Sequence, residues 1–169
     1  METPNRFEIS LTSLSANETT HDWHLDDSFF EAIEDAMIQH GTLDVNLGVR
    51  RKEDVFELTF SIQGEVQVPC NRCLELMHQP IQTEETLRVR LGDEYDDDGE
   101  TITVPADPGT IDITWNLYEL IALQVPIHHV HPEGQCNADM TALLNSHTPG
   151  ATADPRWEAL RALSSHRQS

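Results

Sequence analysis

Apolar and polar residues alternate along the first part of the chain, and this pattern predicts strands. FEISL at residues 7–11 and HDWHLD at 21–26 each alternate over a few residues. Between Thr42 and Leu91 the same period of two recurs in LDVNLGV, VFELTFSI, VQV and LRVRL, with breaks at RKED, at Gly64 and at the turn CNRC. We therefore expect an antiparallel meander whose neighbouring strands are joined by hairpins.

Between the second strand and the meander, the spacing of apolar residues changes to that of a helix. Ser28 and Glu31 form a capping-box pattern, and Gly41 fits the C-terminal end. The apolar stripe of this helix consists of Phe29, Phe30, Ile33, Met37 and Ile38. Such a helix would cover one face of the sheet, and the predicted fold class is α+β.

After the meander, TITV at 101–104 predicts a further strand and WNLYELIAL a further helix. Asp112 precedes this helix, and Pro126 follows it and sets its end. Its apolar residues are spaced for burial and comprise Leu117, Leu120, Ile121 and Leu123. The helix would pack against the sheet.

The chain divides into three parts by composition. Residues 1–136 hold all the periodic segments described above and predict one α+β domain, whereas 137–153 are polar and contain helix breakers, which is typical of a linker. Residues 154–169 begin with an Asp-Pro pair that favours a helix start, and Trp157 recurs with two leucines at helical spacing. We expect a short C-terminal helix there.

Acidic residues outnumber basic residues strongly. The 169 residues include 30 Asp and Glu against 10 Lys and Arg, giving a formal net charge of -20. This charge repels nucleic-acid phosphates over the whole molecule, which excludes broad non-specific binding and restricts any RNA contact to a local patch. The imbalance fits either adaptation to a salt-rich cytoplasm or an ordinary acidic surface.

The chain shows no sign of membrane insertion or export. Its N-terminus, METPNRFEIS, lacks the charged-then-apolar pattern of a signal peptide, and runs such as LIALQVPI are too short to cross a bilayer. We expect a cytoplasmic protein with no membrane partner. In a reducing cytoplasm, three cysteines favour metal binding or simple burial over disulfides.

Four residues in two clusters match the ligand set of a zinc site. Cys70 and Cys73 are separated by two residues in the CNRC turn, and His131 and Cys136 are separated by four residues in HPEGQC. Thiolates and imidazole are the ligands that zinc prefers, and four protein ligands leave no position open for water. The prediction is a structural zinc site that joins two distant segments.

The two turn cysteines are also compatible with roles that need no zinc. They could form a redox pair, although such a pair usually opens a helix and this one joins two predicted strands. They could also be buried small apolar residues without a ligand. If zinc is bound, His128 and His129 are spare metal ligands.

Nothing in the sequence indicates catalysis. It contains no nucleophile elbow, phosphate-binding loop or dinucleotide fingerprint, so we predict no enzyme and no small-molecule substrate.

Most of the basic residues are concentrated in the meander. In a strand, residues two apart share a face, so Arg50 lies beside Lys52 and Arg88 beside Arg90, while Arg72 lies inside the CNRC turn. Such cations can bind RNA phosphate or an acidic partner, or simply neutralise nearby carboxylates. We take these five residues as candidate contacts.

The chain resembles the YceD-like family, the large ribosomal RNA subunit accumulation proteins. The resemblance is carried by PCNRCLELMHQPI, by IDITWNLYELIALQVPIHHVHPEGQC and by DPRWEALRAL, and covers most of residues 42–163. The motif residues are Cys70, Arg72, Cys73, Asp112, Pro126, His131 and Cys136.

The resemblance implies a non-enzymatic role in large ribosomal subunit biogenesis, in which the protein supports accumulation or processing of large-subunit ribosomal RNA. The implied partners are that RNA or ribosomal proteins. The alternative function is an acidic adaptor that holds basic ribosomal proteins.

Overall fold

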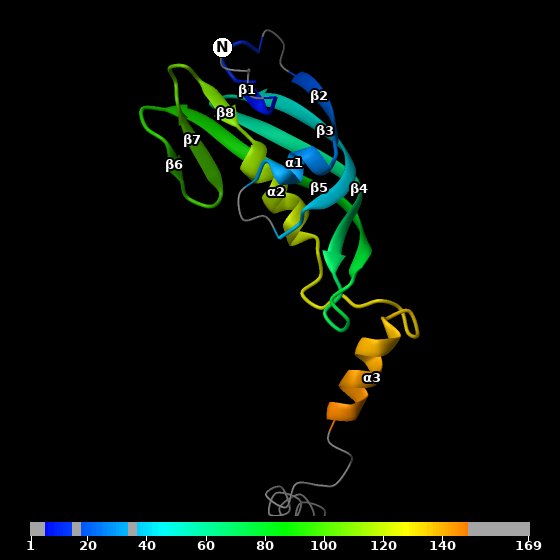
Figure 1. Cartoon of the computed structure of the whole chain (residues 1–169). Coiled ribbons are helices and arrows are strands. Elements are labelled where there is room, and N and C mark those ends of the chain that lie inside the picture. Colours follow the sequence, from blue (N-terminus) through cyan, green and yellow to red (C-terminus); the bar gives the residue numbers. More distant parts are fainter. Residues whose placement is uncertain (1–5, 15–17, 34–36, 149–169) are drawn as a thin grey trace, which may run out of the picture. The chain divides into compact units, whose positions relative to one another are not determined.

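The computed structural model describes residues 6–14, 18–33 and 37–148, and a six-stranded sheet dominates it (Figure 1). The strand order in this sheet is β2-β3-β4-β5-β7-β6, and β1 pairs with β8 in a separate two-stranded sheet. The strands are β1 (Glu8–Ser10), β2 (Glu18–Leu25), β3 (His40–Lys52), β4 (Val55–Pro69), β5 (Leu76–Gly92), β6 (Asp96–Asp97), β7 (Thr101–Pro105) and β8 (Thr110–Asp112). The α+β fold class is confirmed.

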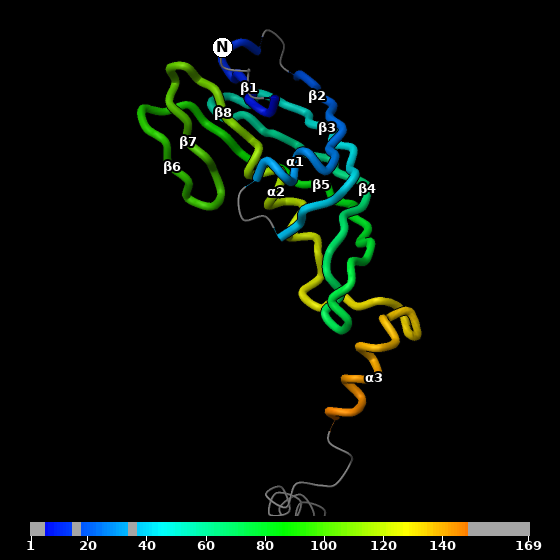
Figure 2. The backbone as a smooth tube through the Cα atoms, in the orientation of Figure 1, coloured from blue at the N-terminus to red at the C-terminus, as the bar shows by residue number. Residues whose placement is uncertain are grey.

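The predicted antiparallel meander is confirmed for β3 to β5, and β2, predicted only as a separate strand, extends it. Each of these strands pairs antiparallel with the next along the chain. Figure 2 shows β4 and β5, the two longest strands, running side by side to the turn that joins them. β7 departs from the expected pattern because it pairs parallel with β5.

Gly64 was predicted as a hairpin break, and that prediction is wrong. Gly64 lies inside β4, where it pairs with Leu43 on one side and Ile81 on the other. Its φ of 149° is one that L side chains rarely adopt, and a Cβ atom would overlap the carbonyl oxygen of Thr42. The glycine therefore permits a close approach of two strands rather than a turn.

The first helix is shorter than its apolar stripe predicts. α1 spans Asp27–Glu31, and its N-cap is Asp26, which accepts a hydrogen bond from the Ser28 backbone N–H at 3.1 Å. The expected C-terminal glycine, Gly41, belongs to β3 instead, because it pairs with Val66 of β4, and its N–H donates to the Asp27 carboxylate at 2.9 Å. Part of the predicted helix, residues 34–36, lies outside the described residues.

The second helix forms where it was predicted. α2 spans Thr114–Leu123, and Asp112 accepts a hydrogen bond from the Thr114 N–H at 2.9 Å at its start. Leu117 and Ile121 are fully buried, but Leu123, predicted to be buried, is 72% exposed. Figure 1 shows α1 and α2 over the same face of the sheet, and their buried residues join one apolar core with that face.

The opposite face of the sheet, which we call the outer face, is polar. It consists of the even-numbered residues of β2, β3 and β5 and the odd-numbered residues of β4, which alternate with the buried residues of the same strands. α1 and α2 leave this face uncovered.

The contacts divide the chain into two units, residues 1–130 and 131–169. The second unit contains α3 (Ala138–His147), whose N-cap Asn137 accepts a hydrogen bond from the Met140 N–H at 3.1 Å. The segment predicted as a linker, 137–153, therefore contains a helix. The predicted C-terminal helix in 154–169 lies outside the described residues, and among those described no helix has the length and apolarity to span a membrane.

Candidate functional site

The CNRC sequence forms a tight, hydrogen-bonded turn between β4 and β5. The Leu74 N–H donates to the Cys70 carbonyl at 2.9 Å, and the Cys70 N–H donates to the Glu75 carbonyl at 2.8 Å. Leu74 has a φ of 63°, an unusual left-handed conformation for a branched residue, which reverses the chain into β5. We call residues 70–75 the cysteine turn.

The cysteine turn is built to hold negative sulfur. The Arg72 backbone N–H lies 3.4 Å from Cys70 Sγ, so an amide donates directly to the sulfur. Cys70 is 0% and Cys73 4% exposed. A buried thiolate is stable only beside donors or a cation, so this arrangement favours a bound metal.

A side chain that sequence reasoning overlooked fixes the turn to the segment after α2. Asn71 donates its backbone N–H to the His129 carbonyl at 2.9 Å, and its side-chain oxygen accepts the His129 N–H at 2.8 Å. The His129 ring contacts the Pro126 carbonyl at 2.7 Å through Nδ1. An asparagine inside a turn was the available signal, because its amide can hydrogen-bond neighbouring backbone.

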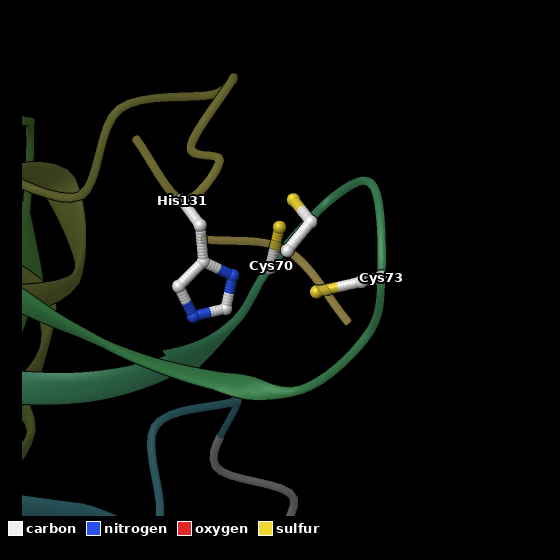
Figure 3. A group of neighbouring side chains, drawn as sticks. Cys70, Cys73 and His131 are labelled. Atoms are coloured by element: carbon white, nitrogen blue, oxygen red, sulfur yellow. The ribbon is translucent and has the colours of Figure 1, made fainter. Parts of the chain in front are cut away.

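The structure brings the four predicted metal ligands together. One ligand atom from each of Cys70, Cys73, His131 and Cys136 can be chosen so that all lie within 4.8 Å of one another. In Figure 3 the side chains of Cys70, Cys73 and His131 point toward a common centre. His131 directly follows Val130, next to the segment that Asn71 holds.

The donor set and spacing fit zinc. Two thiolate sulfurs bound to the same zinc ion in a tetrahedral site lie roughly 3.8 Å apart. Four ligand atoms that already lie within 4.8 Å of one another therefore need only small side-chain movements to reach zinc-binding distances. His128 and His129, the spare ligands, are not part of this group. The cysteine turn joins two strands and opens no helix, unlike the arrangement of a redox pair.

Four of the five candidate basic residues lie in two neighbouring rows across the outer face. In the first row Arg50 pairs with Glu57, which pairs with Arg88, and in the second Val55 lies between Lys52 and Arg90. We call these the basic rows. They contain Arg50, Lys52, Arg88 and Arg90.

Arg72 is far from the basic rows. It lies in the cysteine turn, at the opposite end of β4 from Glu57. At ~3.3 Å per strand residue, the two ends are about 40 Å apart along the strand. The five basic residues therefore do not form one patch beside the turn.

Carboxylates already engage the basic rows. Lys52 Nζ lies 2.7 Å from Glu57 Oε2, and Arg50 lies 3.3 Å from Glu18. The hydrogen bond from Lys52 lowers the pKa of Glu57, and the charges of Lys52, Arg88 and Arg50 lower it further. The first row is thus a mixed network of both signs, and Lys52 of the second row joins it through Glu57.

The chemistry of the outer face limits what it can bind. Among its described residues there is no Phe, Tyr or Trp, so the rings it offers for stacking on nucleic-acid bases are those of His24, His40 and His78. Arg90 donates to the Thr103 hydroxyl at 2.8 Å. The cations of the basic rows allow the face to contact charged groups such as phosphate.

Comparison with known proteins gives one result. The family model described as "Large ribosomal RNA subunit accumulation protein YceD" matches residues 58–164, a span that includes the cysteine turn, α2, all four candidate ligands and α3. No curated protein and no solved structure matches the chain. The match covers more than half of the 169 residues and agrees with the resemblance seen in the motifs, so the chain belongs to the YceD family.

Proposed function

We propose that this protein is a non-enzymatic, cytoplasmic accessory factor in large ribosomal subunit biogenesis that supports accumulation or processing of large-subunit ribosomal RNA. The observation that carries this proposal is the family match over residues 58–164. The matched span holds the cysteine turn and the four candidate ligands, which are the most specialised chemistry in the described residues.

The test of this function is depletion of the protein in its source cells. We expect large-subunit ribosomal RNA to fall relative to small-subunit RNA, with rescue by the unaltered chain. Unchanged RNA levels after complete depletion would contradict the role.

The cysteine turn, in this proposal, holds a structural zinc ion. Cys70, Cys73, His131 and Cys136 would bind it, and the metal would replace several weak contacts by four strong bonds. With four protein ligands the ion has no open position, so it stabilises structure rather than activating water.

Elemental analysis of gently purified protein tests the zinc proposal. We expect about one equivalent per chain. Cys73→Ser should lose most of the metal, and Cys136→Ser should do the same if the second segment supplies a ligand. Less than half an equivalent in the unaltered protein would argue against the site.

For RNA contact, we propose the exposed cations at both ends of β4. Because Arg72 lies far from Arg88 and Arg90, the two positions are tested separately. Crosslinking in cells followed by sequencing would compare Arg72→Gln with the double variant Arg88→Gln and Arg90→Gln. If neither variant lowers the RNA signal, these residues are not the contact.

A second candidate function is the acidic adaptor that holds basic ribosomal proteins. The specific observation in its favour is that Glu18 and Glu57 already form ion pairs with Arg50 and Lys52 of the basic rows, in a chain with a net charge of -20. A basic protein would meet attraction over the whole surface, whereas RNA would meet it only locally. Identification of proteins crosslinked to this chain distinguishes the two functions.

A further inference from the structure

Strand β2 forms an open edge of the six-stranded sheet. Its eight residues pair with β3 without interruption, and no described strand pairs on its other side. Figure 1 shows β2 as the outermost strand at that side of the sheet. The strand contains no proline or lysine, which are residues that commonly protect exposed edges.

Two hydrogen bonds establish which backbone groups point away from the sheet. The His24 carbonyl accepts from the Arg6 side chain at 3.1 Å, so it faces outward rather than toward β3. The Gly41 N–H donates to Asp27, so in β3 the odd-numbered residues face the β2 side. Because orientation alternates along a strand, Thr20 and Asp22 present their N–H and C=O groups at the open edge.

Beside this edge, the outer face has a polar hollow of about 480 Å³. Two carboxylates contribute to its lining, and one oxygen of each already contacts a neighbouring side chain. Asp22 Oδ1 accepts from the Asn46 side chain at 2.7 Å, and Asp44 Oδ1 contacts the His24 ring at 2.8 Å. The second oxygen of each carboxylate provides an acceptor for a cationic side chain.

On the other face of β2, aromatic surface lies at the same edge. The rings of His21 and Trp23 stack with centroids 5.5 Å apart and planes 5° apart. Both residues are only partly buried. A strand added beside β2 would cover the remaining apolar surface with every second side chain.

We propose that β2 binds an extended basic peptide by strand addition, with an arginine or lysine in the hollow beside Asp22 and Asp44 and an apolar residue against Trp23. Charge selects this occupant, because the outer-facing side chains of β2 include Glu18 and Asp22 and no Lys or Arg, in a chain of net charge -20. A second copy of the chain would instead bring another molecule of net charge -20 against this one, and the two would repel. The proposal rests on the adaptor function only for the natural source of the peptide.

The test uses the full chain and a synthetic peptide of alternating arginine and valine, as long as β2. Binding is measured by fluorescence anisotropy at low and high salt. We expect saturable binding that weakens as salt increases. A peptide with glutamate in place of arginine should not bind. Two further peptides are N-methylated on alternate amides, one on the odd-numbered and one on the even-numbered residues. One of these two should bind at least tenfold more weakly than the unmethylated peptide.

Variants of the protein locate the site. Thr20→Pro removes one outward N–H without breaking the ladder to β3, and we expect at least a tenfold loss of affinity, whereas Thr20→Ala should stay within twofold. The double variant Asp22→Asn and Asp44→Asn should also lose about tenfold. Thermal unfolding establishes that each variant is folded. If Thr20→Pro does not fold, the N-methylated peptides still test whether binding uses backbone hydrogen bonds at the edge.

Several results would overturn the proposal. The first is that Thr20→Pro and Thr20→Ala bind the arginine peptide equally well, and the second is that the glutamate peptide binds as tightly as the arginine peptide. The third is that the unaltered chain forms a dimer that Thr20→Pro dissociates, which would assign the edge to a second copy. If the peptide does not bind although depletion still lowers large-subunit RNA, this inference fails and the proposed function stands.

Discussion

The two ends of the β4–β5 pair are held in different ways. At the cysteine turn, buried sulfurs and backbone hydrogen bonds of 2.8 to 2.9 Å fix the chain, and Asn71 binds it to the segment after α2. At the basic rows, long side chains meet across exposed strands at 2.7 and 3.3 Å. Both ends belong to the same two strands and rest on the same core.

This difference separates stability from recognition. Buried, directional contacts cost several kcal/mol when one partner is removed, whereas exposed ion pairs contribute about 0 to 1 kcal/mol and are screened by salt. We therefore expect changes at the cysteine turn to alter folding, and changes at the basic rows to alter binding with little effect on folding.

The largest expected effect comes from removing a sulfur ligand. Cys73→Ser should lower the free energy of unfolding by roughly 3 kcal/mol or more, because metal-binding energy contributes to folding energy. Thermal unfolding with and without chelator measures this. The unaltered chain should lose stability when chelator is added, and the variant should not respond.

Arg88→Gln is the matched control at the other end of β5. It should change stability by less than about 0.5 kcal/mol, as is usual for an exposed charge. If Cys73→Ser were as mild as Arg88→Gln, the contrast between the two ends would disappear and the sulfurs would be simple buried residues.

Asn71 should give the next largest effect. Asn71→Ala removes the acceptor of the His129 N–H, and because this hydrogen bond is exposed, the loss should cost about 0.5 to 1.5 kcal/mol. Asn71→Asp keeps an oxygen at the same position and should restore part of the loss. Faster loss of metal to a chelator in Asn71→Ala would show that the clamp holds the two ligand segments together, and an unchanged rate would separate the clamp from the metal site.

Short-range patterns predicted most of the fold. The alternation that runs through β3 to β5 predicted the meander, and the spacing of Leu117 and Ile121 predicted α2. The pattern failed where distant contacts decide the outcome. Phe29 to Ile38 have helical spacing, yet α1 ends at Glu31 and Gly41 pairs with Val66 of β4, and Gly64 is required by a neighbouring strand rather than by a turn.

The candidate site was predictable in its ligands but not in its supports. Residue type and spacing identified Cys70, Cys73, His131 and Cys136, because few residue types bind zinc. Asn71 forms its hydrogen bonds with a residue 58 positions away, and no local sequence pattern predicts that partner. Likewise, only the strand register shows that the basic rows lie far from Arg72.

A smaller effect is expected from relieving backbone strain at the two ends of the β4–β5 pair. Each end has a neighbouring turn in which one residue adopts a left-handed conformation. Leu74 in the cysteine turn has a φ of 63°, and Glu53 in the β3–β4 turn has a φ of 53°. Glycine adopts this conformation without steric cost, so Leu74→Gly and Glu53→Gly should each stabilise the protein by up to about 1 kcal/mol. Chemical denaturation measures both, and a loss of stability in Leu74→Gly alone would mean that its side chain supports the turn.

The smallest expected effect is the pH dependence of the basic rows. The hydrogen bond from Lys52 lowers the pKa of Glu57 below its ordinary value of 4.5. A carboxyl whose pKa is lowered by folding contributes stability above its unfolded pKa, and that contribution is lost as the pH falls through the lower, folded pKa. Lys52→Gln should raise the pKa of Glu57 toward its ordinary value, as followed by NMR titration of the side-chain carboxyl carbon. Arg90→Gln is the control, since Arg90 bonds to Thr103 instead. Equal shifts in both variants would mean that net charge, rather than the Lys52 contact, sets this pKa.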